Sequence, residues 1–254
     1  TPILTASSPE GARDFIVPSR KFHGKFYALP QAPQQFKQLL MCSGFDKYFQ
    51  IAPCFRDEDA RADRTLEFYQ LDLEMAFAEE EDILKIGEKI FTETFKKFGK
   101  GKKVTPFTRL SFKESMERFG TDKPDLRNPL ELVDLTDVFE ETTFRPFRGV
   151  QVEGIVVEDI ADKSNSWFNE LVDFANDIGM PGIGYFKVNE DLSFAGPIDK
   201  FLSEDEREDL IKVAKLKPNS VIFFIADRKK AYKFASQIRD ELGRKLDLIK
   251  DDEY

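Results

Sequence analysis

The sequence has 254 residues, of which 41% are hydrophobic and 33% charged, and its formal net charge is −9 at pH 7. A chain of this length can bury one or two hydrophobic cores, and it contains no apolar run near the roughly 18 residues that a membrane-spanning helix needs. Two cysteines and one histidine exclude a disulfide framework and argue against a histidine-based triad or zinc site.

The first half of the chain predicts two helices that flank a pair of strands. Pro33 and Gly44 stand at the start and just past the end of the first helix, and Gly99 follows the second one, in which apolar residues recur at helical spacing from Ile83 to Phe98. The expected elements are helices over 34–42 and 83–98 and strands over 48–56 and 66–77, the strands separated by the charged loop 57–65.

The second half predicts a separate domain of mixed structure. Residues 1–126 carry 20 basic and 20 acidic side chains, whereas residues 127–254 carry 18 and 27, so the whole net charge lies in the second half. This shift and the proline-rich turn over 121–129 indicate a boundary there. The expected elements are strands over 150–159, 184–188 and 221–226 and helices over 204–216 and 229–246. Strands between helices without steady β-α-β spacing favour an α+β fold.

The paired strands place two kinds of side chain on opposite faces, because alternate residues of a strand share a face. One face is apolar and can seal onto a core; it holds Phe49, Ile51, Phe55, Tyr69, Leu71, Leu73, Met75 and Phe77. The other face presents Arg56, Phe68, Gln70, Asp72 and Glu74. An ordinary antiparallel hairpin with a wetted outer face is the alternative.

The loop between the strands is unusually charged. With its flanks, residues 55–68, it holds three arginines and five carboxylates, whereas a hairpin that serves only stability uses a short turn with Gly or Asn. Arginine is the planar donor suited to phosphate and carboxylate, and acidic neighbours can orient it. A solvated salt-bridge loop is the alternative.

This stretch resembles motif 2 of the bacterial-type aspartyl-tRNA synthetases, which are class II enzymes. The residues that carry the resemblance are Phe55-Arg56-Asp57-Glu58-Asp59, Arg61-Ala62-Asp63-Arg64, Glu67-Phe68, Gln70 and Asp72. Residues 8–14 and 26–40 match the same family in order, and residues 129–254 resemble the insertion (GAD-like) domain that the family shares with tRNA-dependent amidotransferase subunits. The resemblance implies a partial antiparallel-sheet catalytic domain over 1–128, followed by a separate α+β insertion domain over 129–254.

The resemblance also implies the chemistry. The family activates L-aspartate with Mg-ATP to aspartyl-adenylate and transfers the aspartyl group to tRNA. Arg56 would be the catalytic residue, neutralising charge on the α-phosphate, and Phe68 would stack under adenine. The implied ATP-binding residues are Arg56, Asp57, Glu58, Thr65 and Phe68. The implied aspartate-binding residues are Glu10, Gln34, Lys37, Arg56, Gln70 and Asp72. Arg61 and Arg64 would meet the acceptor end of the tRNA.

Without the resemblance, Lys37 would be interpreted as a surface helix lysine and Glu10 as a capping or loop carboxylate. We interpret Lys37 as the cation for the aspartate side chain, with Gln34 one turn earlier on its helix. Glu10 and Asp72 are the carboxylates for the substrate ammonium, and Gln70 is a neighbouring polar contact. No residue of this sequence is assigned as a metal ligand, and the magnesium ligands are expected elsewhere in the parent enzyme.

Several parts of the family pattern are not found in this sequence: most of motif 1, motif 3 and the anticodon-binding barrel. We therefore expect an internal part of a homodimeric, cytoplasmic enzyme that is inactive by itself. The first residues lack the basic region of a secretory signal, and the acidic total argues against a DNA or membrane partner. Related enzymes for asparagine or lysine, and a non-catalytic module that binds tRNA or a protein, are the alternatives.

Overall fold

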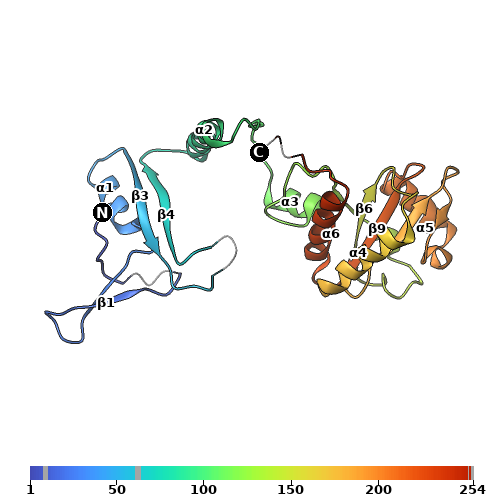
Figure 1. Ribbon diagram of the computed structural model, residues 1–254, viewed down its shortest axis with the longest axis horizontal. Helices are drawn as coiled ribbons and strands as arrows, with labels where there is room; N and C mark the ends of the chain where they lie inside the picture. Colours follow the sequence, from blue (N-terminus) through green and yellow to red (C-terminus); the bar gives the residue numbers. More distant parts are fainter. Residues whose placement is uncertain (8–10, 61–63, 251, 253–254) are drawn as a thin grey trace. The chain divides into compact units, whose positions relative to one another are not determined.

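The computed structural model describes residues 1–7, 11–60, 64–250 and 252. The chain forms two compact units, residues 1–90 and 91–254 (Figure 1). The sequence predicts a catalytic domain that ends at residue 128 and an insertion domain that begins at residue 129. This domain boundary stays a prediction. The mixture of helices and antiparallel sheets confirms the α+β class.

The first unit is built on two hairpins and a short helix. Strand β1 (Ile16–Pro18) pairs with β2 (Phe26–Ala28), and β3 (Lys47–Phe55) pairs with β4 (Glu67–Met75), both pairs antiparallel. Helix α1 (Gln34–Cys42) contacts both β3 and β4. The predicted helix over 34–42 and the two predicted strands are therefore confirmed, the strands to within two residues at each end.

The register of β3 and β4 decides which side chains share a face. Gln50 lies opposite Asp72, and Cys54 lies opposite Phe68. The even-numbered residues of both strands consequently point to the side of the hairpin where Lys37 of α1 is buried, and they are buried or half-buried. The polar face that the sequence predicted is thus covered by α1, and it is not a wetted outer face.

The apolar face of this hairpin does not seal onto a core within the described residues. This agrees with the expectation that apolar hairpin surface stays exposed when the rest of the family's sheet is not in this sequence. The exposed fraction is 75% for Phe49 and 71% for Tyr69, and Ile51 and Leu71 are also exposed. Helix α1 is only nine residues long and lies on the opposite side of the hairpin. The exposed odd-numbered side chains therefore form an apolar surface that no element among the described residues covers.

Helix α2 (Glu80–Phe98) begins in the first unit and ends in the second. Three acidic residues occupy its first turn and Lys96 and Lys97 its last turn, which suits the helix dipole. None of its residues is fully buried. The apolar spacing that predicted this helix is confirmed, although the helix starts three residues before Ile83.

The second unit holds a five-stranded antiparallel sheet in the order β5-β6-β9-β7-β8. The strands are β5 (Leu132–Asp134), β6 (Gln151–Val157), β7 (Gly184–Val188), β8 (Phe194–Ala195) and β9 (Val221–Asp227). The helices are α3 (Phe112–Phe119), α4 (Asn165–Asp177), α5 (Glu204–Val213) and α6 (Ala231–Lys245), with short 3-10 turns η1 (Asp137–Phe139) and η2 (Asp199–Phe201). The three predicted strands and two predicted helices of this half are confirmed as β6, β7, β9, α5 and α6.

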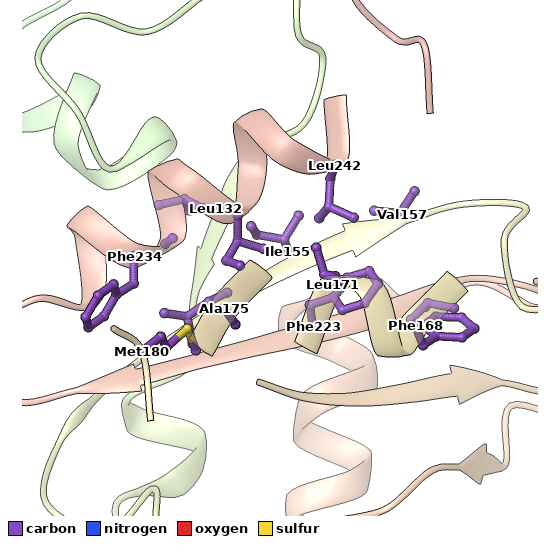
Figure 2. Packing of buried hydrophobic residues seen from close by; sticks show 14 of the residues in the cluster. Leu132, Ile155, Val157, Phe168, Leu171, Ala175, Met180, Phe223, Phe234 and Leu242 are labelled. Carbon is purple, nitrogen blue, oxygen red and sulfur yellow. The ribbon is translucent and has the colours of Figure 1, made fainter. Parts of the chain in front are cut away.

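Both faces of this sheet are covered, because the side chains of β9 alternate between two hydrophobic clusters. Phe223 packs with residues of α4 and α6, such as Leu171 and Leu242, in one cluster (Figure 2). Phe224 packs with Leu210 of α5 in the other. A strand buried on both sides needs a continuous apolar run, which the sequence supplies over 221–226.

Two buried polar groups of this unit stand out. Arg239 of α6 has no exposed surface, and its guanidinium donates to the carbonyls of Asp125, Asn128 and Leu130. It thereby ties α6 to the segment that precedes β5. Glu153 of β6 is equally buried, and burial raises the pKa of its carboxyl to about 7.

No helix among the described residues is long and apolar enough to cross a membrane.

Candidate functional site

The buried face of the β3–β4 hairpin carries a charged cluster. Lys37, from the first turn of α1, donates to an Asp72 carboxylate oxygen at 2.8 Å, and its Nζ lies 3.2 Å from an oxygen of Glu74. Asp72 and Glu74 are two residues apart on β4, so they share the face that α1 covers. The helix and the strand thus bring together a cation and two carboxylates that lie 35 and 37 residues further along the sequence.

The electrostatics of the cluster favour a charged lysine. Burial alone would lower the pKa of Lys37, but hydrogen bonds and charges from Asp72 and Glu74 outweigh it and raise that pKa. With one cation and two carboxylates, the cluster carries a net charge of −1. Asp72 keeps its Oδ2 buried and without a hydrogen-bond partner among the described residues. A buried carboxylate oxygen of this kind calls for a donor from a ligand.

Polar side chains of β3 border the cluster. The Tyr48 hydroxyl donates to the side-chain Oε1 of Gln50 at 2.7 Å, and Gln50 lies directly opposite Asp72 in the strand register. Burial, followed by the nearby charge of Asp72, raises the pKa of the Tyr48 hydroxyl. Further along the same face, the Cys54 thiol lies 3.6 Å from the side-chain carbonyl of Gln70. The wall beside Lys37 is therefore polar along several residues of both strands.

A second group forms where the strands run into the charged loop. The Arg56 guanidinium lies 5.1 Å from the ring centre of Phe68, a cation–π distance. These two residues line a hollow of about 400 Å³ together with loop residues. The other lining residues are Glu58, Asp59, Ala60, Arg64, Thr65 and Leu66. A planar aromatic floor beside a guanidinium suits a ligand with a flat ring and an anionic group.

The start of this loop is held by a neighbouring segment of the chain. The Asp57 N–H donates to the carbonyl of Arg13 at 3.1 Å, and the two residues form an antiparallel bridge. Asp57, Glu58 and Arg64 line a second hollow of about 540 Å³ with residues 11–13. Segment 11–14 therefore lies beside the loop, as a wall of the same region.

The structure brings together most, but not all, of the residues that the sequence singled out. Lys37 meets Asp72, Arg56 meets Phe68, and the ATP-binding candidates Glu58 and Thr65 line the first hollow. Gln34 is exposed, whereas Lys37, three residues later, is buried. Glu10 and Arg61 lie outside the described residues. The roles of all these residues stay predictions.

Sequence reasoning assigned no role to Glu74, Tyr48 or Gln50, although each belongs to the same cluster. Glu74 follows Asp72 by two residues, and this spacing alone places it on the same face. Tyr48 and Gln50 alternate onto the face of Arg56 as well, and the register of the hairpin sets them opposite Glu74 and Asp72.

The described residues hold no group of three or more His, Cys, Asp or Glu side chains that could bind a metal ion.

Comparison with known proteins identifies the class to which this fold and site belong. The family described as "tRNA synthetases class II (D, K and N)" matches residues 1–249. The chain therefore belongs to the class II tRNA synthetases of this group.

The curated relatives that resemble this chain include several aspartate–tRNA ligases. An aspartate–tRNA ligase of Streptomyces avermitilis is 57% identical over 226 residues, which cover 88% of this chain and 38% of that protein. An aspartate–tRNA(Asp/Asn) ligase of Rickettsia felis is 52% identical over 261 residues, which cover 99% of this chain and 43% of that protein. One of Ehrlichia chaffeensis is 48% identical over 261 residues, with 100% and 44% covered. The chain thus spans about two fifths of the length of these relatives.

Proposed function

We propose that this chain forms part of an aspartate–tRNA ligase and carries half of its aspartate- and ATP-binding site. The observation that supports this best is the shared face of the β3–β4 hairpin: a buried Lys37–Asp72 pair at one position and an Arg56–Phe68 pair at another. One pair suits a small amino diacid and the other a nucleotide. The names of the relatives agree with this combination.

Aspartate brings a side-chain carboxylate and an ammonium, and the cluster around Lys37 offers a partner for each. The Lys37 ammonium has three N–H donors, and it can turn one toward the substrate carboxylate while it keeps its contact with Asp72. The unpartnered Oδ2 of Asp72 can accept from the substrate ammonium. Gln70 extends the polar wall on the same strand. The proposed roles of Glu10 and Gln34 in aspartate binding rest on the family resemblance alone.

The nucleotide would lie in the hollow beside Arg56. Its adenine would stack on Phe68, and its α-phosphate would meet the Arg56 guanidinium. In the first step the aspartate α-carboxylate attacks the α-phosphorus, an oxygen–phosphorus bond forms, and pyrophosphate leaves with the electron pair of the broken bond. Arg56 stabilises the negative charge that gathers on the phosphate oxygens in this step. Asp57, Glu58 and Thr65 would complete the ATP contacts.

In the second step a hydroxyl of the tRNA 3′ end attacks the carbonyl carbon of the aspartyl-adenylate and gives up its proton. A new ester bond forms, the bond from that carbon to the phosphate oxygen breaks, and AMP leaves with the electron pair. Arg64 lines the hollow next to Arg56, and this position supports our proposal that it binds the acceptor end. Arg61 is proposed for the same role from the family resemblance. Contacts of this kind position the RNA backbone and carry no sequence information.

The remaining proposals concern the whole protein. We propose that it uses Mg²⁺ with ATP, acts as a cytoplasmic homodimer and holds its magnesium ligands outside this chain. We also propose that residues 129–254 form an insertion domain separate from the catalytic domain.

The experiment that tests this function is aspartate-dependent exchange of pyrophosphate into ATP by the full-length protein that contains this sequence. We expect exchange with L-aspartate and at least a hundredfold less with L-asparagine or L-lysine, because only aspartate among the three has a side-chain carboxylate for Lys37. Faster exchange with asparagine or lysine would assign the chain to a different member of the group. The absence of exchange with all three, combined with tRNA binding, would support a non-catalytic module instead.

A further inference from the structure

Gln31 is a buried polar residue for which the proposed chemistry has no use. Its exposed fraction is 8%, and it lies between β2 and α1. Both donors of its side-chain amide group are occupied: Nε2 donates to the Ala12 carbonyl at 2.8 Å and to an Asp14 carboxylate oxygen at 2.6 Å. Asp14 also accepts a hydrogen bond from the Ser7 hydroxyl. The amide thus clamps segment 12–14 to the chain just before α1.

The clamped segment is the one that holds the start of the charged loop. Between the two clamped residues stands Arg13, whose carbonyl accepts from the Asp57 N–H at 3.1 Å. The main chain around Gln31 meets the loop as well. The Pro30 carbonyl accepts from the Phe55 N–H at 2.8 Å, and the Gln31 carbonyl lies 3.5 Å from an Arg56 guanidinium nitrogen. Residues on both sides of Arg56 are consequently tied to Gln31 or to its neighbours.

We propose that Gln31 is a positioning residue that, with Asp14, fixes the backbone at Asp57 and thereby the Arg56 guanidinium and Glu58. Gln31 does not itself touch the substrates. This inference rests on the proposed function, because it concerns the placement of groups that would bind the ATP phosphates. It extends that function to a pair of residues outside the motif 2 hairpin.

The chemistry of the clamp requires an amide at this position. The two groups that Gln31 meets are a carbonyl and a carboxylate, both of which are acceptors. A glutamate of the same size would place a second carboxylate against Asp14 and would supply no donor to Ala12.

The test compares Gln31→Glu with Gln38→Glu in the full-length protein. Gln38 is an exposed glutamine of α1, so its change adds the same charge nearby without touching the clamp. For Gln31→Glu we expect kcat/KM for ATP in pyrophosphate exchange to fall about 10- to 100-fold. We expect the KM for aspartate to rise less than the KM for ATP, because Gln31 acts on aspartate binding through Arg56 but no contact of the Lys37 cluster runs through Gln31. Gln38→Glu should leave both values within twofold of the original.

A second variant reverses the polarity of the pair. In Gln31→Glu combined with Asp14→Asn, the new asparagine can donate to the new glutamate, so one of the two clamp contacts returns. Gln31→Glu lowers the logarithm of kcat/KM for ATP relative to the original protein, and we expect the double variant to recover at least a third of that decrease. A double variant no better than Gln31→Glu, or an equal loss in the KM of both substrates, would overturn the proposal.

Amide hydrogen exchange separates this proposal from the proposed function. The Asp57 N–H should exchange at least tenfold faster in Gln31→Glu than in Gln38→Glu, whether or not the protein makes aspartyl-adenylate, because its acceptor at Arg13 is released. If the original protein shows no pyrophosphate exchange, the proposed function fails while this measurement still decides on the clamp. Unchanged protection of Asp57 contradicts the clamp even where activity is present.

Discussion

The Lys37 ammonium and the Asp72 carboxylate form a buried ion pair at 2.8 Å, and only one of the two Asp72 oxygens is used in it. Removing two charges from water is costly unless the pair gains further hydrogen bonds. Glu74, 3.2 Å from the same ammonium, supplies one such contact on the lysine side. The second Asp72 oxygen has no equivalent among the described residues, which is the feature expected of a site that completes its hydrogen bonds with a ligand.

Replacing Lys37 with methionine keeps most of the side-chain volume and removes the charge. We expect the KM for aspartate in pyrophosphate exchange by the full-length protein to rise about 10- to 100-fold, because a hydrogen bond to a charged group is worth about 1.5–3 kcal/mol. The KM for ATP should change much less, since the Arg56–Phe68 pair is intact. Lys47→Met, at an exposed lysine of β3, is the control. A similar rise in both variants would show that general charge, and not the cluster, matters.

Replacing Phe68 with alanine tests the aromatic floor of the first hollow. Stacking of a base on an aromatic ring is worth about 1–3 kcal/mol, so we expect the KM for ATP to rise about 5- to 150-fold. Phe68→Tyr should behave like the original protein because it keeps the ring. Phe22→Ala removes an exposed ring outside the hollow and serves as the control. If Phe68→Ala left the KM for ATP unchanged, the nucleotide would not lie on this ring.

The buried Glu153 makes the stability of the second unit depend on pH. Its pKa is raised to about 7 by burial, and Asp134 and Glu117 add repulsion, while a hydrogen bond from Gln151 acts in the opposite direction. The pKa of Glu153 is near 4.5 in the unfolded chain and about 7 in the folded one. At a pH between these two values, unfolding therefore releases a proton from Glu153. The free energy of unfolding should therefore fall as the pH rises through this range, by about 3 kcal/mol in all.

The variant Glu153→Gln isolates this effect, because it cannot lose a proton. We expect it to be more stable than the original chain by about 3 kcal/mol at pH 8 and nearly equal at pH 4.5. The fluorescence of Trp167, the single tryptophan, reports on this unit, since Trp167 packs against the cluster around Phe223. Urea titrations at several pH values measure the difference. Glu190→Gln, at an exposed site, should show the pH dependence of the original chain.

The exposed apolar face of the β3–β4 hairpin should make the 254-residue chain self-associate and bind hydrophobic dyes. Phe49 and Tyr69 are its most exposed side chains within the two strands. The double change Phe49→Lys and Tyr69→Lys should lower dye fluorescence at least twofold and shift the chain toward the monomer in light scattering. The control is the double change Leu39→Lys and Phe45→Lys, at exposed residues outside the strands. It should lower dye fluorescence and self-association less.

The sequence by itself determined which segments form helices, which form strands, and most of the residues at which they begin and end. Pro33 and Gly44 mark α1, and the alternation over 66–77 marks β4, because caps and periodicity are local properties of the chain. It also determined that Arg56, Phe68, Gln70, Asp72 and Glu74 share one face, since that follows from strand geometry alone.

Only the tertiary structure decided which groups meet. The pairing of Lys37 with Asp72 depends on how α1 lies on the hairpin, and the meeting of Gln31 with Asp14 depends on how segment 12–14 crosses it. The sequence predicted an apolar and a polar face for the hairpin, and the structure shows that α1 packs on the polar face beside Asp72 and Glu74. Burial and ion pairing arise from contacts between segments far apart along the chain, and local patterns of hydrophobicity do not determine which of those segments meet.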